Sequence, residues 1–239
     1  MNTIKVDNDN IVSKLTINCD TNIFYNNYDG KLEIDVVGDC KVFEYINNCS
    51  LDTVYNVSSN FALNRFVVSS SVNTLINLNE EKINFNYYYS NINLGDNFYE
   101  IVINHNKPYT SSDIINHGIN LEDSKLSYIV IGKVLKNSIG VCCNQDSRII
   151  TLDNNSCSIK PDLIIDNDDI VANHSSYIGY FNKDKMFYLM SRGLSEVQAL
   201  KLLIKSFLIG KMDISFLERN IILKNIDVYW GWSYESWWF

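Results

Sequence analysis

The chain has 239 residues and a mass of 27.5 kDa, which fits one large domain or one domain with a small appendage. Hydrophobic residues make up 46% of it, enough for a sizeable core, and the formal net charge is −8. An acidic chain without clustered Lys and Arg is poorly suited to the phosphates of a nucleic acid. No apolar run is long enough to span a bilayer and the N-terminus lacks the layout of a signal peptide. We therefore expect a cytoplasmic protein with neither a nucleic-acid nor a membrane partner.

From residue 1 to about residue 180 the sequence predicts many short β-strands. β-Branched and aromatic residues are frequent, and Asn, Asp and Gly interrupt them every several residues. Apolar and polar residues alternate clearly in 83–87, 92–94 and 101–105. Asparagine, roughly one residue in seven, tolerates left-handed backbone and can form hydrogen-bonded ladders between stacked coils. These features fit a sandwich, a barrel or a β-solenoid, and the periodicity alone does not choose among them.

The chain contains three histidines, all in or next to this strand-rich region. We expect His105 and His117 to make structural hydrogen bonds that hold one coil to the next. His174 follows a strand predicted at 163–169 and lies in a predicted turn, 173–179. A neutral imidazole in such a turn can bind a metal or transfer a proton, which makes His174 the sharpest candidate for chemistry.

After Gly179 the pattern becomes helical, which divides the chain into a β core, 1–180, and a helical segment, 181–239. A short helix is predicted at 183–191 and is followed by Gly193, which suits the left-handed position after a helix. Ser195 is the predicted N-cap of a second helix that ends at Gly210, and a third helix is predicted at 213–223.

All four tryptophans lie in the last eleven residues, 229–239. So dense an aromatic tail can pack on the chain's own helices or dock on a partner, and the sequence does not choose between the two.

The six cysteines show no CxxC pair and no zinc-type spacing. In a reducing cytoplasm we expect free thiols rather than disulfides. The chain also lacks a Walker-type phosphate loop, a GxSxG elbow and an HExxH helix, so we expect neither ATP binding nor enzymatic turnover of these kinds.

The segment 160–207 resembles the C-terminal signature of the SufB/SufD family, the scaffold subunits of the SUF iron–sulfur cluster assembly machinery. The matching positions are Lys160–Pro161, Asn173–Gly179, Phe187–Ser195, Ala199 and Phe207. The resemblance implies an all-β core with a small α part: a right-handed parallel β-helix, or β-solenoid, followed by a short C-terminal helical segment. The family's N-terminal helical domain is absent from the sequence pattern, so we expect a shortened member.

In functional terms, the resemblance implies a non-catalytic scaffold subunit. Its expected partners are a SufC-like ATPase and a SufB-like subunit or a second copy of itself. No cofactor is expected to stay bound, but a transient iron–sulfur cluster is expected at a subunit interface. Ser175 stands where the SufB-type turn has Glu, which favours a SufD-like member. A carbohydrate-active β-helix enzyme and a purely structural β-solenoid protein are the alternatives.

The same resemblance selects candidate site residues. His174 is the candidate cluster-site residue, whereas the position of the key SufB cysteine falls near Gln145 and Asp146, where no thiol is present. Cys142 and Cys143 lie nearby in an apolar run and are expected to be buried. Cys157, a weaker metal-ligand candidate, precedes His174 by about one coil, a spacing that predicts the two stacked on each other.

The residues expected to contact the ATPase lie on the helical segment. Arg192 is expected to anchor this contact through charge-assisted hydrogen bonds. The full predicted set is Met186, Phe187, Tyr188, Arg192, Gly193, Leu203 and Phe207.

Overall fold

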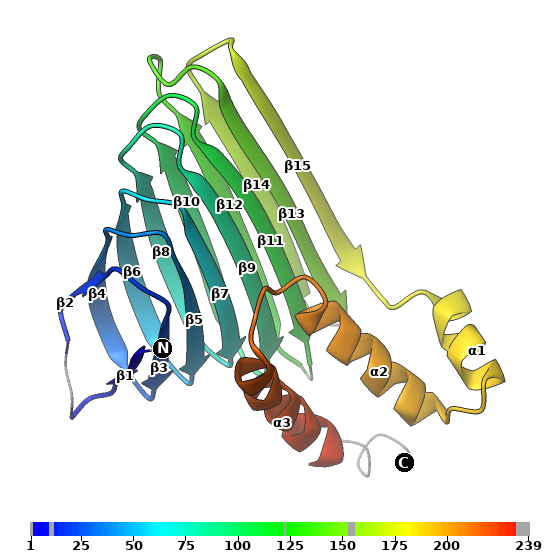
Figure 1. Cartoon of the computed structure of the whole chain (residues 1–239). Helices are drawn as coiled ribbons and strands as arrows, with labels where there is room; N and C mark the ends of the chain where they lie inside the picture. Colours follow the sequence, from blue (N-terminus) through cyan, green and yellow to red (C-terminus); the bar gives the residue numbers. More distant parts are fainter. Residues whose placement is uncertain (1, 10–11, 122, 153–155, 233–239) are drawn as a thin grey trace.

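The computed structural model describes residues 2–9, 12–121, 123–152 and 156–232. Most of these residues form two large β-sheets, and three helices follow them at the C-terminal end (Figure 1). Part of the predicted aromatic tail, 233–239, lies outside the described residues.

The strands enter the two sheets alternately. The odd-numbered strands form the eight-stranded sheet: β1 Asn2–Val6, β3 Thr21–Asn26, β5 Cys40–Asn47, β7 Phe61–Val68, β9 Asn84–Asn93, β11 Ser111–Asn120, β13 Val141–Thr151 and β15 Ile170–Gly179. The even-numbered strands form the seven-stranded sheet: β2 Lys14–Ile17, β4 Asp29–Val36, β6 Ser50–Val57, β8 Ser71–Leu78, β10 Asn97–His105, β12 Lys125–Val134 and β14 Ser156–Ile165. The helices are α1 Lys183–Ser191, α2 Glu196–Ile209 and α3 Phe216–Trp232.

Every strand pairing within these sheets is parallel, and each turn of the chain adds one strand to each sheet. This winding is a flattened parallel β-helix. It confirms the β-solenoid and excludes the sandwich and barrel that the periodicity left open.

The coils lengthen along the chain. Bonded partners in successive coils are 21 residues apart at Asn27 and Asn48, 27 apart at Asn79 and Asn106, and 31 apart at Asn116 and Ser147. The solenoid therefore widens toward β15, as Figure 1 shows. A changing coil length also explains why the sequence has no strict period.

Asparagine has the role that the composition predicts. Asn27 and Asn48 both have left-handed backbone, with φ of 49° and 52°, and the side chain of Asn48 donates to that of Asn27 at 2.7 Å. On the outer face of the seven-stranded sheet, Asn104 donates to Asn77 and Asn77 to Asn56. These ladders satisfy amide groups between coils.

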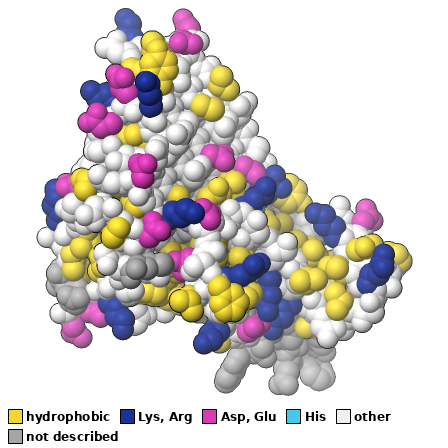
Figure 2. Space-filling view, viewed as in Figure 1, with side chains coloured by type: hydrophobic (Ala, Val, Ile, Leu, Met, Phe, Trp, Pro, Cys, Tyr) yellow, Lys and Arg dark blue, Asp and Glu magenta, His cyan; other side chains and the backbone are white. Residues whose placement is uncertain are grey.

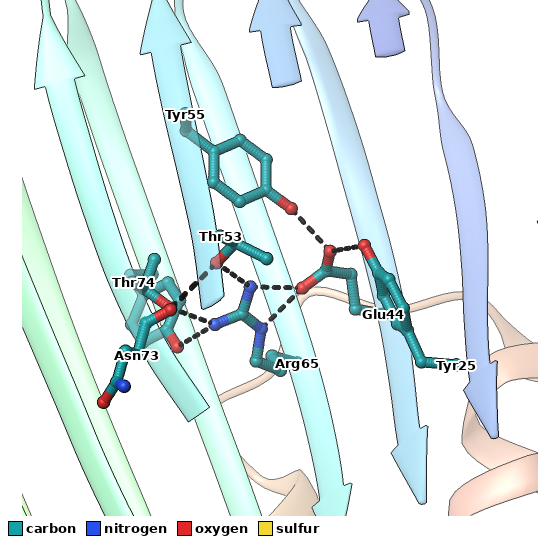
Figure 3. A network of polar contacts seen from close by, with 8 residues as sticks. Tyr25, Glu44, Thr53, Tyr55, Arg65, Asn73 and Thr74 are labelled. Carbon is teal, nitrogen blue, oxygen red and sulfur yellow. Dashed lines mark hydrogen bonds and ion pairs between the residues drawn. The ribbon is translucent and has the colours of Figure 1, made fainter. Parts of the chain in front are cut away.

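The interior is filled by alternate residues of both sheets, including a run of aromatic rings between Tyr55 and Tyr128. It also encloses a polar network (Figure 3). At its centre Arg65 and Glu44, both without exposed side-chain surface, form an ion pair at 2.5 Å.

The helices cover part of the outer face of the eight-stranded sheet. Apolar residues of α2 and α3, such as Ile204 and Ile222, share a core with Phe66 and Ile119 of the sheet. Within the described ranges, no helix is long and apolar enough to cross a membrane.

The ends of α1 and α2 follow the sequence closely. Ser195 caps α2 in a capping box with Gln198, and Gly193 has a φ of 93°. The prediction for the third helix was wrong at both ends: α3 begins at Phe216, after Ser215 and Glu218 pair as a second capping box, and runs on to Trp232.

Candidate functional site

His174 lies in the middle of β15, the last strand of the eight-stranded sheet, and not in the predicted turn. Its polar neighbours look like turn residues in the sequence, but they continue the ladders between coils. Asn173 donates to Asn144 at 3.1 Å, and Ser175 donates to Asp146 at 2.7 Å.

The register places His174 beside Gln145 of β13, on the face that lines the coil interior. Aligned residues of parallel strands point to the same side of a sheet, and Gln145 is buried. The inner row of β15 is therefore Ile170, Ala172, His174, Ser176 and Ile178. His174 is nevertheless exposed, because no described strand pairs with the far edge of β15.

Gln145 brings an unsatisfied polar atom to this end of the interior. Its amide nitrogen lies 3.4 Å from the carbonyl oxygen of Asp162, while its side-chain oxygen is buried and has no hydrogen-bond partner. Gly132 makes room for it, since a Cβ there would lie 3.1 Å from the Gln145 amide nitrogen and 2.7 Å from the Cys143 sulfur. A buried acceptor thus lies one strand away from the imidazole.

Cys157 does not stack on His174, which corrects the sequence prediction. Cys157 belongs to β14 in the seven-stranded sheet, where it is aligned with Leu126. Aligned residues at this end are 29 or 31 residues apart, so a shorter spacing leads to the opposite sheet. The Cys157 thiol accepts a hydrogen bond from Asn120 at 3.3 Å, and burial raises its pKa. A thiol that is harder to ionise is a weaker nucleophile and metal ligand at neutral pH.

Cys143 is closer to His174 in the register than Cys157 is. It is fully buried, lies on the inner row of β13 and is aligned with Ala172, two residues before His174. Burial raises the pKa of this thiol. Cys142 faces outward and is half-buried. The sequence predicted both Cys142 and Cys143 to be buried, and the pairing register shows that only Cys143 faces the interior.

The other histidines are structural. His105 is buried and its ring nitrogens lie 2.7 Å from the Thr110 hydroxyl and 3.0 Å from the Ser112 hydroxyl, within its own coil. His117 donates from Nδ1 to the backbone carbonyl of Phe207 at 2.7 Å. Its imidazole also stacks on the phenyl ring of Phe207, with 4.3 Å between the ring centroids. The sequence predicted a bond between coils for both residues, and the structure corrects both: the His105 ring bonds within its own coil, and His117 holds α2 to the sheet.

The predicted partner-binding residues fall into two groups. Phe187, Tyr188, Arg192 and Gly193 are exposed, with 75% of Phe187 and 56% of Tyr188 accessible. α1 has no buried residue, and Figure 2 shows hydrophobic side chains gathered together with Lys and Arg over the projecting helical part. Met186, Leu203 and Phe207 are half-buried, and Phe207 packs toward the sheet.

The chain is similar to proteins of iron–sulfur cluster assembly. The cluster assembly protein SufD of Bacillus subtilis is 27% identical over 113 residues, which cover 46% of this chain and 26% of that protein. SufB of the same organism and a SufBD family protein of Staphylococcus saprophyticus are each 31% identical over 105 residues, 44% of this chain and 23% of those proteins. The chain thus aligns with about a quarter of the length of these curated relatives.

The family model for the SufBD core domain of the SUF system of FeS cluster assembly matches residues 56–207, more than half of the chain. The matched part includes the strands from β7 to β15 and the His174 row, and it extends through α1 to Phe207 in α2. This agrees with the resemblance found in 160–207 and with the parallel β-helix. The chain belongs to the SufBD family of iron–sulfur cluster assembly proteins.

Proposed function

We propose that this protein is a cytoplasmic, non-catalytic scaffold subunit of a SUF-type complex. In this role it joins a SufB-like subunit, or a second copy of itself, and is acted on by a SufC-like ATPase. The observation that carries the proposal is the uncovered inner row of β15, which presents His174 at the end of a SufBD core.

The last coil has the properties of an interface. Ile178, on the inner row of β15, is 43% exposed, and Ile170 and Ala172 of the same row are only half-buried, although this face would be buried in a longer solenoid. An edge strand also leaves backbone N–H and C=O groups available for pairing. Strand addition by a partner would cover both the edge and the apolar row.

His174 would supply one part of a shared site. Within the described residues, no three side chains of His, Cys, Asp or Glu converge to hold a metal ion, so further ligands must come from elsewhere. Neutral imidazole suits iron, and thiolates hold iron–sulfur clusters. We infer that the partner brings the essential thiolate and that the cluster is a transient cargo at the interface.

Anaerobic reconstitution with iron and sulfide tests this role. The complex coexpressed with the SufB-like subunit is compared with its His174→Ala variant, and cluster absorbance and bound iron are measured. Asn173→Ala is the matched control, because Asn173 neighbours His174 but faces outward, and its side chain donates to the ladder residue Asn144. We expect the His174 variant to assemble and to lose most of the cluster signal, while the control keeps it. Equal signal in all three would make His174 structural.

The ATPase contact is assigned to α1. Its exposed Phe187 and Tyr188 provide apolar anchors, and the Arg192 guanidinium lies 5.2 Å from the Tyr188 ring centroid, next to them. Arg192→Glu is expected to weaken binding of the SufC-type ATPase at least tenfold in calorimetry. The control is Lys136→Glu, an exposed charge reversal on the β12–β13 connection at the other end of the strands. Unchanged affinity of a folded Arg192→Glu protein would remove this residue from the contact.

A further inference from the structure

The first coils, which precede the segment 56–207 matched by the family model, bring two cysteines together. Thr21 of β3 is aligned with Val42 of β5. Cys19 lies in the bend before β3 and Cys40 begins β5; extending the same register back by two residues places Cys19 beside Cys40 in the next coil. The register is held at this point, because the backbone N–H of Lys41 donates to the Asp20 carboxylate at 2.8 Å.

This alignment meets the distance requirement of a disulfide. Neighbouring strands of a sheet lie about 4.8 Å apart. Disulfide-bonded cysteines have Cα atoms roughly 4.4–6.8 Å apart, so no large backbone movement is needed. Three of the other four cysteines are aligned with residues that are not cysteines: Cys142 with Ser111, Cys143 with Ser112 and Cys157 with Leu126. The fourth, Cys49, accepts a hydrogen bond from the backbone N–H of Tyr28.

The two thiols differ in access and acidity. Cys19 is exposed, and its sulfur accepts a hydrogen bond from the side chain of Asn2 at 3.3 Å. Cys40 is 7% exposed and packs on the interior core. Burial, together with the charges of Asp20, Cys19 and Asp39, raises the pKa of Cys40 to about 11. Core packing accounts for Cys40, but it does not account for an exposed thiol held next to it.

We propose that Cys19 and Cys40 form a reversible dithiol–disulfide site that is oxidised by low-molecular-weight disulfides. The Cys19 thiolate attacks one sulfur of the disulfide, forms a mixed disulfide and releases one small thiolate. The Cys40 thiolate then attacks the Cys19 sulfur, forms the Cys19–Cys40 bond and releases the second small thiolate. The protein gives up two protons and two electrons, and the small disulfide becomes two thiols.

The bond would join consecutive coils at the N-terminal end of the solenoid. Within the described residues, β1 is the outermost strand of the eight-stranded sheet on this side, and it pairs only with β3. A covalent link between the bend before β3 and the start of β5 would hold the coils that lie next to this edge. Reduction would release them.

Peptide mapping of the whole chain can detect the bond directly. Trypsin cuts after Lys14, Lys31 and Lys41, so Cys19 and Cys40 fall in separate peptides. After incubation of the folded protein with oxidised glutathione at pH 8, we expect these two peptides as one linked species that is two hydrogens lighter than their sum. Reduction should separate them. Unlinked peptides with free thiols would overturn the proposal.

The order of the two steps has its own test. In Cys40→Ser the mixed disulfide cannot close, so glutathione should stay on Cys19. In Cys19→Ser no glutathione adduct should form at Cys40. Cys49→Ser is the control and should leave the Cys19–Cys40 link unchanged. Because the pKa of Cys40 is about 11, closure of the mixed disulfide should accelerate about tenfold per pH unit between pH 7 and 9. A mixed disulfide on Cys19 that persists at pH 9 in the native sequence would also contradict the proposal.

Discussion

At the scale of single residues, the buried Glu44–Arg65 pair is the most demanding feature of the interior. Its charges are removed from water, which costs several kcal/mol per ion unless partners replace the solvent. Both carboxylate oxygens are used: Oε2 by Arg65, and Oε1 by the hydroxyls of Tyr25 and Tyr55 at 2.8 and 2.6 Å. Arg65 also donates to Thr74 at 2.6 Å. Such a network favours one coil register over its slipped alternatives.

The first prediction concerns that pair. Arg65→Met leaves the Glu44 carboxylate buried without its cation, so we expect the free energy of unfolding to fall by about 3–5 kcal/mol. Urea denaturation measures the loss. Lys14→Met is the control: Lys14 pairs with Glu33 and Asp35 at the surface, where solvent screens the charges, so this substitution should lower the free energy of unfolding far less than Arg65→Met. Equal losses in the two variants would contradict the assigned role.

The second prediction is a pH dependence that comes from His105. Burial lowers the pKa of His105 to about 4, so the folded state holds the neutral ring while the unfolded chain protonates near its ordinary value of about 6.5. Its contribution is full above pH 6.5 and is lost as the pH falls toward 4, by about 3 kcal/mol in total. Stability curves of the native sequence and His105→Gln should therefore differ in slope only within this range. Parallel curves would show that His105 titrates alike in both states.

At the scale of elements, local chemistry made the first two helices predictable. Lys183–Ser191, the Ser195 cap and the left-handed Gly193 follow from residues next to one another in sequence. The start of α3 was missed because Ser215 and Glu218 outcompete Asp213, whose backbone N–H donates instead to Asn64 of β7. The His174 strand was missed for a related reason. Its polar neighbours are satisfied by Asn144 and Asp146 of the previous coil, a contact that no local pattern reveals.

The third prediction compares two aromatic residues of the helical segment, one that packs against the sheet and one that is exposed to solvent. Phe207 stacks on His117 and meets Phe181, so Phe207→Ala should lower the free energy of unfolding by about 2 kcal/mol and speed hydrogen exchange in α2. Phe187→Ala removes a ring of the same kind that is 75% exposed, and it should change stability by less than about 0.5 kcal/mol. Equal destabilisation by Phe207→Ala and Phe187→Ala would contradict this prediction, because it would mean that α1 packs against the sheet as α2 does.

At the scale of the whole molecule, the solenoid has ends that its own chain does not cover within the described residues. Each coil contacts only its neighbours, so the end coils receive support from one side. The fold class was predictable from strand content and family resemblance. The position of the inner row of β15 was not predictable, because the coils grow from 21 to 31 residues and leave no fixed period from which to derive the register. The site depends on that register. The register places His174 beside Gln145, and it places Cys157 beside Leu126 in the other sheet, away from His174.

The last prediction is that the β15 edge mediates assembly. Ile178→Lys places a charge on the inner row, where a partner coil would bury it, so association with the SufB-like subunit or a second copy should weaken at least tenfold. Light scattering and sedimentation measure the complex. Val171→Lys is the matched control: Val171 is 60% exposed on the same strand but faces outward, where it would remain in solvent after strand addition. Both isolated variants should unfold like the native chain. A native chain that stays monomeric beside the SufB-like subunit, or two variants that associate equally well, would place the interface elsewhere on the molecule.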